Sequence, residues 1–296
     1  MRNVDELIEK ALSRRNFMVG ASSAAALTAV GCNKHFYPQP GPAPNPNPTL
    51  TDADYLNFAL NLEYLEASYY LIAATGSGLS AADMGSGPGT VTGGSQVPFT
   101  SSIQREYAYE IAQDELNHVR FLRSALGSAA VPMPAIDLVN SFNAAASAAG
   151  IGPSFNPFAN FDTFLIGAFV FEDVGVTAYS GAAPLLTSKT YLGAAAGIQA
   201  VEAYHAGEIR ALILRTGAEY VEYANQISAL RAKLGGGNET ALSFTTVAAC
   251  DPTNAIAYAR TPEQVLNIVY GSSDGNLTYG GFFPSGLNGN IKSTAP

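Results

Sequence analysis

The turns Glu115-Leu116-Asn117-His118 and Glu202-Ala203-Tyr204-His205 decide the fold that this sequence predicts. In each turn a glutamate precedes a histidine by three residues, and residues three apart share one face of an α-helix. A single helical turn can therefore offer one carboxylate oxygen and one imidazole nitrogen to a metal ion. The chain has three histidines, and two of them close such turns. The repeated motif predicts two helices that face a common metal site.

Four long helices are predicted, because apolar residues recur at steps of three and four along four segments. These segments are 51–75, 101–126, 161–181 and 188–215. A loop is expected at 76–99, and the proline-containing connection 128–160 is expected to hold one short helix at 135–149. This arrangement is typical of a four-helix bundle with one long crossover. No alternating strand pattern competes, so the predicted fold class is all-α.

The first and third helices each place a glutamate on the predicted inner face. One glutamate from each of two helices, with a Glu-x-x-His turn from each of the other two, forms a dinuclear carboxylate site. The predicted metal ligands are Glu63, Glu115, His118, Glu172, Glu202 and His205. Carboxylates suit iron and manganese, so we expect two iron ions, with two manganese ions as the alternative. A metal-free hydrogen-bonded network competes, but four carboxylates buried without a cation would repel one another strongly.

The first and third helices also resemble each other in sequence. Aligning Glu63 with Glu172 places Gly175 at the position of Glu66. This favours Glu63 over Glu66 as a ligand and leaves Glu66 as an alternative ligand or a neighbour of the ligands. Gly175 lies in mid-helix, where glycine costs about 1 kcal/mol relative to alanine. It either clears space opposite Glu66 or allows close helix packing.

The same alignment pairs Tyr70 with Tyr179. Aligning Glu115 with Glu202 pairs Arg123 with Arg210, so the sequence repeat predicts two helix-pair halves related by a pseudo-two-fold. The tyrosines are predicted one to two turns from the metals, where they could hydrogen-bond ligands or donate electrons. The alternative is that they are core tyrosines with satisfied hydroxyls. The arginines are expected to be solvated near helix ends, with pairing to carboxylates near the site as the alternative. Two aspartates adjoin ligand positions but are expected to point off the inner face, Asp114 and Asp173.

The N-terminal residues 1–32 are predicted to be an export signal. Ser13-Arg14-Arg15-Asn16-Phe17-Met18 resembles the twin-arginine motif, and the weakly apolar stretch that follows is too short and polar to span a bilayer securely. Ala29-Val30-Gly31-Cys32 resembles a lipobox, so Cys32 is a candidate lipidation site that would anchor the protein to the membrane. An ordinary signal peptide with an incidental cysteine is the alternative. The expected location is the periplasm or cell envelope.

Other segments flank the bundle. The predicted divisions are a signal at 1–32, a proline-rich tether at 33–50, the bundle at 51–216 and a C-terminal extension at 217–296. His35 belongs to the tether and is expected to be solvated. The extension is predicted to contain a helix at 219–234, a short helix that begins near Pro262, and a glycine-rich tail.

The composition excludes several classes of protein. A net charge of -9 argues against a nucleic-acid partner, because phosphate contacts need clustered lysine and arginine. Two cysteines cannot form a disulfide framework or a four-cysteine metal site within one chain. The chain also lacks paired Cys-x-x-Cys motifs, so an electron donor, where the reaction needs one, must be a separate and unidentified partner.

Several motifs resemble the ferritin-like domain family, which includes the plant desiccation-related proteins and many exported bacterial relatives. Besides the two Glu-x-x-His turns, they are Leu62-Glu63-Tyr64-Leu65-Glu66-Ala67, Phe171-Glu172-Asp173-Val174-Gly175-Val176 and Gly280-Gly281-Phe282-Phe283-Pro284-Ser285-Gly286-Leu287-Asn288-Gly289. The resemblance covers about residues 50–290 and implies a bundle with a di-metal site. The loop at 76–99 and the extension after residue 217 depart from compact storage ferritins and argue against a cage.

Three functions are compatible with these features. The first is a redox protein that oxidises Fe(II) or reduces oxygen or peroxide at the dinuclear centre. The second is peroxide disproportionation of the manganese-catalase type, which needs no external electron donor. The third is a non-enzymatic stress or desiccation protein in which a metal, where present, stabilises the bundle. A homodimer is an open alternative for the assembly, and an iron-storage shell would require a much larger one.

Overall fold

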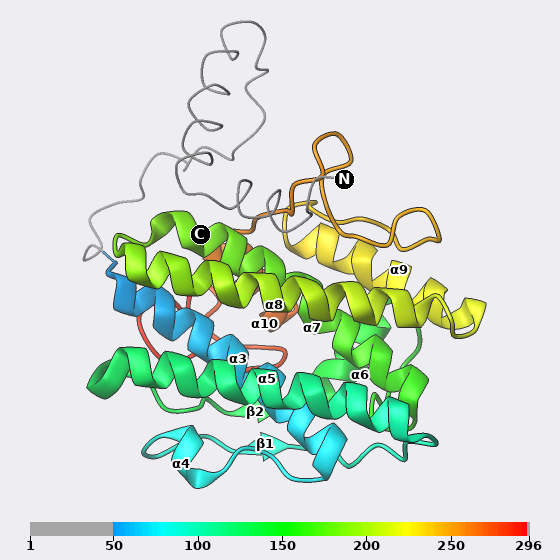
Figure 1. Cartoon of the computed structure of the whole chain (residues 1–296), viewed down its shortest axis with the longest axis horizontal. Coiled ribbons are helices and arrows are strands. Elements are labelled where there is room, and N and C mark those ends of the chain that lie inside the picture. The colour runs from blue at the N-terminus through cyan, green and yellow to red at the C-terminus, as the bar shows by residue number, and fades with distance from the viewer. Residues whose placement is uncertain (1–49, 295–296) are drawn as a thin grey trace, which may run out of the picture. The chain divides into compact units, whose positions relative to one another are not determined.

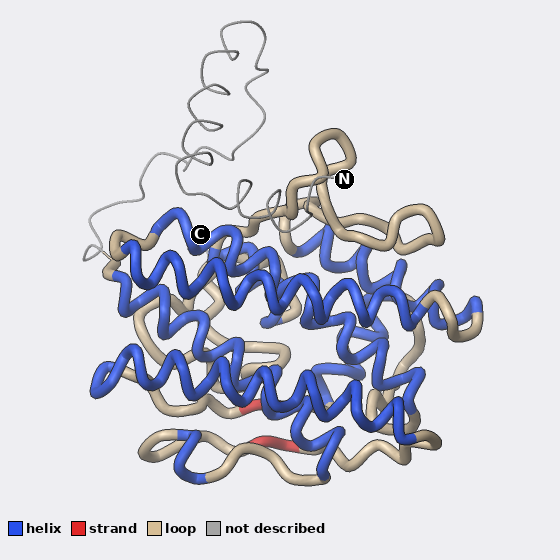
Figure 2. The backbone as a smooth tube through the Cα atoms, viewed as in Figure 1, coloured by secondary structure: helices blue, strands red, loops and turns tan. Residues whose placement is uncertain are grey.

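The structure is a computed structural model that describes residues 50–294. The predicted export signal, the candidate lipidation site Cys32, His35 and nearly all of the tether lie outside the described residues. Four long helices form the bundle, and Figures 1 and 2 show them running side by side. They are α3 (Asp52–Thr75), α5 (Ser102–Leu126), α7 (Phe161–Ala182) and α8 (Lys189–Ile213). The predicted all-α class and the four-helix bundle are confirmed.

The helices pair as the sequence repeat predicts. α3 packs mainly against α5, α7 packs mainly against α8, and the two pairs meet where α3 contacts α7. Local signals set the helix starts: Ser101 accepts a hydrogen bond from the backbone N–H of Gln104, and Asn160 accepts one from that of Thr163. Side chains of this kind satisfy N–H groups that have no partner within the helix.

The two central helices are buried all round rather than along one face. Every residue from Leu60 to Ala74 in α3 is buried, and so is every residue from Phe164 to Tyr179 in α7. The helical spacing of the sequence predicts one inner face for each. The difference arises because segments from outside the bundle cover the other side of both helices, and a helix enclosed on all sides carries apolar residues all round.

The loop after α3 and the crossover before α7 are joined by a pair of short strands that the sequence did not indicate. The loop after α3 contains a short helix, α4 (Ala81–Met84), and a two-residue strand, β1 (Val91–Thr92). β1 pairs in parallel with β2 (Ile136–Asp137) in the crossover, with Val91 opposite Ile136. Because β2 occupies the start of the predicted crossover helix, that helix, α6 (Asn140–Ala149), begins five residues later than expected.

The C-terminal segment packs on the bundle. α9 (Ala218–Leu234) contacts α6 and α7, and α10 (Pro262–Tyr270) contacts α7 and α9. The glycine-rich tail is fastened to α3, because Asn61 and Asn288 exchange two hydrogen bonds of 2.9 and 3.0 Å. This cover explains the burial of α3 and α7. Within residues 50–294, no helix has the length and apolar character needed to cross a membrane.

Candidate metal centre

The predicted ligands converge from all four bundle helices into one buried cluster. Two groups of side chains place their ligand atoms within 4.8 Å of one another. The first group comprises Glu63, Glu115, His118 and Glu202, and the second comprises Glu115, Glu172 and His205. Glu115 belongs to both groups, so its carboxylate is placed to bridge two ions. Glu66 belongs to neither, which agrees with the preference for Glu63.

Both histidines direct Nδ1 toward the carboxylates. His118 Nδ1 lies 3.3 Å from an oxygen of Glu63 and 3.3 Å from one of Glu115. His205 Nδ1 lies 3.0 Å from the other oxygen of Glu115. The two imidazole rings are 6.5 Å apart between centroids. Glu115 thus separates two pockets of similar chemistry, one on each side of its carboxylate.

His205 has a further carboxylate neighbour on its outer side. Its Nε2 lies 3.3 Å from Oδ2 of Asp114, whose side chain is 41% exposed. A carboxylate on the outer nitrogen of an imidazole fixes its tautomer and leaves the inner nitrogen free to ligate. Asp114 was expected to point off the inner face, and it does so while still contacting a predicted ligand.

The paired tyrosines hydrogen-bond the paired glutamates across the bundle. The hydroxyl of Tyr70 on α3 donates to Oε1 of Glu172 on α7, and Tyr179 on α7 donates to Oε1 of Glu63 on α3. The arrangement follows the two-fold repeat of the sequence. Of the alternatives considered for these tyrosines, the structure shows hydrogen bonding to predicted ligands. Each glutamate is left with Oε2 for another partner.

Six atoms of the cluster make no hydrogen bond of good geometry among the described residues, although imidazole nitrogens lie 3.0 to 3.6 Å from several of them. They are Oε2 of Glu63, Oε1 of Glu115, Oε2 of Glu172, both oxygens of Glu202 and Nδ1 of His205. Buried polar atoms in folded proteins are nearly always paired, because an unpaired one costs free energy. Six such atoms directed at one another are what a cation would satisfy. The donor set, carboxylates with two imidazoles, fits iron or manganese.

The buried charges shift one another's pKa values. Burial raises the pKa of Glu63 to about 7. Burial and the neighbouring carboxylates raise the pKa of Glu202 well above its usual range. Burial acts to lower the pKa of His205, but Glu172 and Glu115 outweigh it and raise the pKa to about 12. Protons neutralise the cluster when no cation does, so a metal ion must displace protons in order to bind.

Gly175 leaves room for the cluster in the backbone of α7. A Cβ at this position would lie 2.1 Å from Oε2 of Glu202 and 3.4 Å from Oε1 of Glu66. The first distance is a severe overlap, so the glycine clears space chiefly for Glu202 and only secondarily for Glu66. The sequence repeat singled out Gly175, but it suggested Glu66 as the residue that needs the space, whereas Glu202 lies closer.

A second buried network lies behind the cluster. Arg210 is 1% exposed and pairs with Asp173 at 2.8 Å, so the alternative of pairing with a carboxylate near the site holds for it, and the expected solvation is wrong. Arg231 of α9 pairs with the same carboxylate at 2.7 Å and with Glu239 at 2.9 Å. The partners of Asp173 come from α8 and α9, distant in sequence, so no local pattern could identify them. Arg123 instead donates to the hydroxyl of Tyr64 at 2.7 Å.

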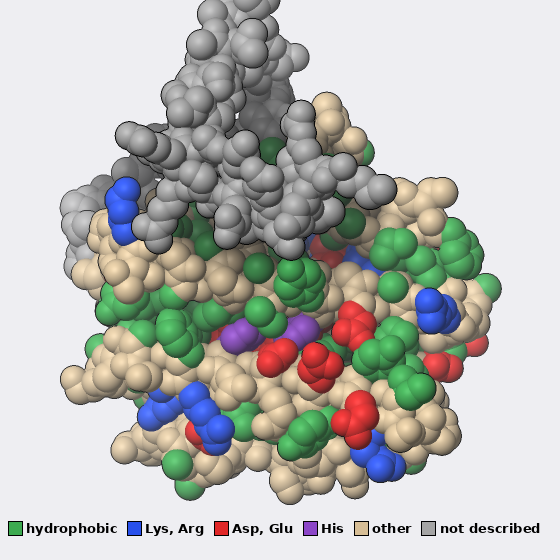
Figure 3. All heavy atoms as spheres, viewed as in Figure 1, with side chains coloured by type: hydrophobic (Ala, Val, Ile, Leu, Met, Phe, Trp, Pro, Cys, Tyr) green, Lys and Arg blue, Asp and Glu red, His purple; other side chains and the backbone are tan. Residues whose placement is uncertain are grey.

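One side of the cluster is close to the surface. Figure 3 shows histidine side chains at the surface between α5 and α8, with acidic side chains beside them. His118 and His205 are 8% and 4% exposed. The histidine side of the cluster therefore lies close beneath a surface that carries acidic side chains.

Comparison with known proteins extends this picture. Residues 51–215 match the family model described as the ferritin-like domain. The chain is 33% identical over 247 residues to the desiccation-related protein PCC13-62 of Craterostigma plantagineum, covering 73% of this chain and 76% of that protein. It is 28% identical over 267 residues to the ferritin-like catalase Nec2 of Nesocodon mauritianus, covering 81% of this chain and 84% of that protein.

Proposed function

This chain belongs to the ferritin-like domain family, and on that premise we propose that its centre binds two iron or manganese ions and disproportionates hydrogen peroxide. The observation that carries the proposal is the set of six buried, unpartnered ligand atoms between the four bundle helices. One relative is named a ferritin-like catalase. Disproportionation also suits a chain without a Cys-x-x-Cys electron relay, because peroxide serves as both reductant and oxidant.

The reaction consumes two peroxide molecules. One is oxidised to dioxygen and gives up two electrons and two protons; the other takes them up and yields two waters. A bound metal pair would store the two electrons between the half-reactions. Glu63, Glu115, His118 and Glu202 would hold one ion, and Glu115, Glu172 and His205 would hold the other.

The protein's part is to hold the ligands and carry protons. Tyr70 and Tyr179 fix the orientation of the two terminal glutamates by donating to Oε1 of each. Burial and four neighbouring carboxylates raise the pKa of Glu66 well above its usual range. Its carboxyl group therefore holds a proton next to the cluster, where the reduced peroxide must gain protons to leave as water.

We also propose that the protein acts outside the cytoplasm. The twin-arginine motif within residues 1–32 supports export, and Cys32 supports a lipid anchor. Mass spectrometry of the mature protein distinguishes the alternatives. A diacyl- or triacyl-glyceryl group on Cys32 supports the anchored form, and an unmodified N-terminus supports a released one.

The decisive experiment joins metal content to turnover. The purified protein is reconstituted with Mn(II) or Fe(II), its metal stoichiometry is measured by mass spectrometry, and oxygen release from peroxide is followed with an electrode. We expect about two ions per chain and oxygen release that Glu115→Gln abolishes. Loading with fewer than one ion per chain would contradict the proposal. So would full loading without oxygen release.

A second candidate function is a protective protein in which the metal pair only stabilises the bundle. The relative named a desiccation-related protein favours it. This function predicts full loading, a raised melting temperature on loading and no turnover. Rapid oxidation of Fe(II) without oxygen release from peroxide would instead support the ferroxidase chemistry considered from the sequence.

A further inference from the structure

A small cavity adjoins the metal centre on the side formed by α3 and α7. Three residues of α3, four of α7, two of α10 and Phe282 of the tail line it, and α5 and α8 contribute none. Its volume is about 20 Å³. Roughly 10–15 Å³ is enough for one water molecule, so the cavity accepts a molecule of water or peroxide size and nothing much larger.

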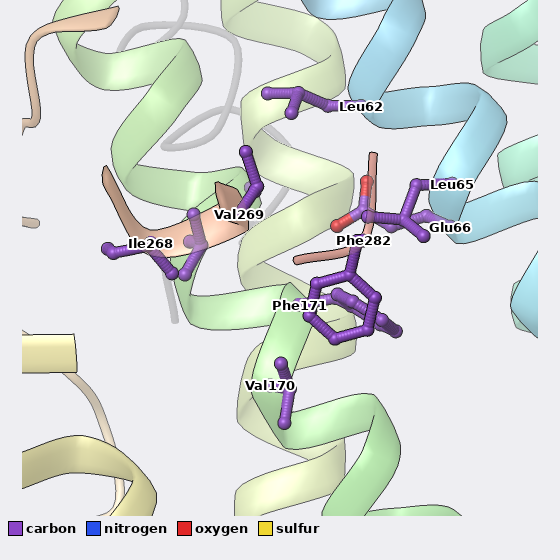
Figure 4. Close-up of a pocket in the computed structure, with 10 residues that line it drawn as sticks. Leu62, Leu65, Glu66, Val170, Phe171, Ile268, Val269 and Phe282 are labelled. Atoms are coloured by element: carbon purple, nitrogen blue, oxygen red, sulfur yellow. The ribbon is translucent and has the colours of Figure 1, made fainter. Parts of the chain in front are cut away.

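The lining is apolar except at one point. Figure 4 shows the carboxyl group of Glu66 among the side chains of Leu65, Phe171 and Phe282. Glu66 is 5% exposed, and it is the one charged residue of the lining. Tyrosines bond to Glu63 and Glu172, but no donor within residues 50–294 bonds to Glu66. The oxygens of Glu66 are not among the fully buried polar atoms, so a small molecule in the cavity can reach and hydrogen-bond this carboxyl group.

The cavity meets the metal centre at Gly175. This glycine is part of the lining, and the space its missing side chain leaves is bounded by Oε2 of Glu202, a predicted ligand, and by Oε1 of Glu66. Three residues of the lining keep a small solvent exposure: Leu62, Val170 and Ile268 are each 8% exposed. The cavity therefore lies between the surface and the carboxylate cluster.

We propose that this cavity is the receiving site for hydrogen peroxide, with Glu66 as its hydrogen-bonding partner. The inference rests on the proposed function and adds a route and a substrate contact to it. Apolar walls exclude ions, because transfer of a charge out of water is costly. An uncharged molecule that both donates and accepts hydrogen bonds is suited to a carboxyl group in such walls. Cations would use the histidine side, and peroxide would use this one.

Steady-state kinetics of the metal-loaded protein test the route. Val170→Phe fills the cavity from the side of α7, and Glu66→Leu removes the hydrogen-bonding partner at similar size. Val139→Phe is the matched control, because it makes the same substitution at a 42% exposed residue outside this lining. For the first two variants we expect KM for peroxide to rise about tenfold or more with the metal content unchanged. For the control we expect a wild-type KM.

A structural measurement gives a readout that does not depend on turnover. Crystals loaded with zinc, which is not redox-active, are soaked in hydrogen peroxide. Electron density for a two-atom molecule within hydrogen-bond distance of Glu66 is expected in the wild type and not in Val170→Phe. If Val170→Phe fails to fold, Glu66→Leu serves as the variant both for the KM measurement and for the electron density in the cavity.

The outcomes separate this inference from the proposed function. Peroxide turnover with an unchanged KM in both cavity variants overturns the receiving site and leaves the function intact. If the loaded wild type does not turn over peroxide, the proposed function is wrong and the crystals test the receiving site alone. Peroxide bound at Glu66 supports the site, and water alone in the cavity overturns it.

Discussion

At the scale of single residues, the missing side chain of Gly175 on α7 leaves space for the carboxylates of Glu202 and Glu66. Gly175→Ala would place a Cβ 2.1 Å from Oε2 of Glu202. Because that carboxylate has to move, we expect the loaded protein to hold about one metal ion per chain or none, as measured by mass spectrometry. Gly197→Ala on α8 is the control, since its Cβ meets nothing within 4 Å. It should keep full loading and gain about 1 kcal/mol from helix propensity. Full loading of Gly175→Ala would show that Glu202 is not a ligand.

The two tyrosines give a second test at this scale. Tyr70→Phe removes the donor to Oε1 of Glu172 and leaves that oxygen buried without a partner. Loss of such an outer contact typically lowers metal affinity by about 10- to 100-fold. Tyr69→Phe is a close control, because Tyr69 donates to the backbone oxygen of Phe164 rather than to a ligand. Competition titration with a chromogenic chelator measures both. Equal affinities for the two variants would assign Tyr70 a purely structural role.

At the scale of the elements, the buried arginine network connects α9 to the bundle. Arg231 pairs with Asp173 and Glu239 and is 2% exposed. Arg231→Met leaves both carboxylates short of a buried partner, which typically costs about 3–5 kcal/mol. Lys233→Met on the same helix is exposed and should change the free energy of unfolding by less than about 0.5 kcal/mol. Urea denaturation measures the difference. A similar small change for both would mean that the network contributes little stability.

The elements also show what the sequence could and could not predict. Helix periodicity is local, so the predicted helix boundaries lie within a few residues of those observed, α6 apart. The predicted ligand set rests on two spacings and an internal repeat, which are also local in sequence. The pairing of β1 with β2 and the burial of Arg210 depend on contacts between distant segments. A strand of two residues leaves no detectable alternation, and an arginine near a helix end gives no local sign of a buried partner.

At the scale of the whole molecule, the C-terminal segment encloses the centre on the side away from α5 and α8. The tail is held to α3 by Asn61 and Asn288, and α10 supplies part of the wall beside Glu66. The extension is therefore part of the environment of the site. The side toward the tail is apolar and the side between α5 and α8 is acidic, which is the difference on which the two proposed routes depend.

The buried carboxylates and histidines of the cluster make the stability of the whole molecule depend on pH. Burial raises the pKa of Glu63 from 4.5 to about 7, so the folded metal-free protein binds a proton that the unfolded chain releases. The raised pKa of His205, about 12, acts in the same direction. Stability is therefore full near pH 4.5 and falls as the pH rises toward 7 and beyond. The lowered pKa of Glu115, where the two histidines outweigh burial, matters only below pH 4.5.

Metal loading should reverse this trend. The shift of Glu63 alone corresponds to roughly 3 kcal/mol, so the metal-free protein should melt several degrees lower at pH 8 than at pH 5. In the loaded protein a cation replaces the protons, and affinity increases as the carboxylates ionise. Its melting temperature should therefore rise over the same interval. Calorimetry of both forms at matched ionic strength makes the comparison. Parallel curves for the two forms would mean that the bound metal is not held by this cluster.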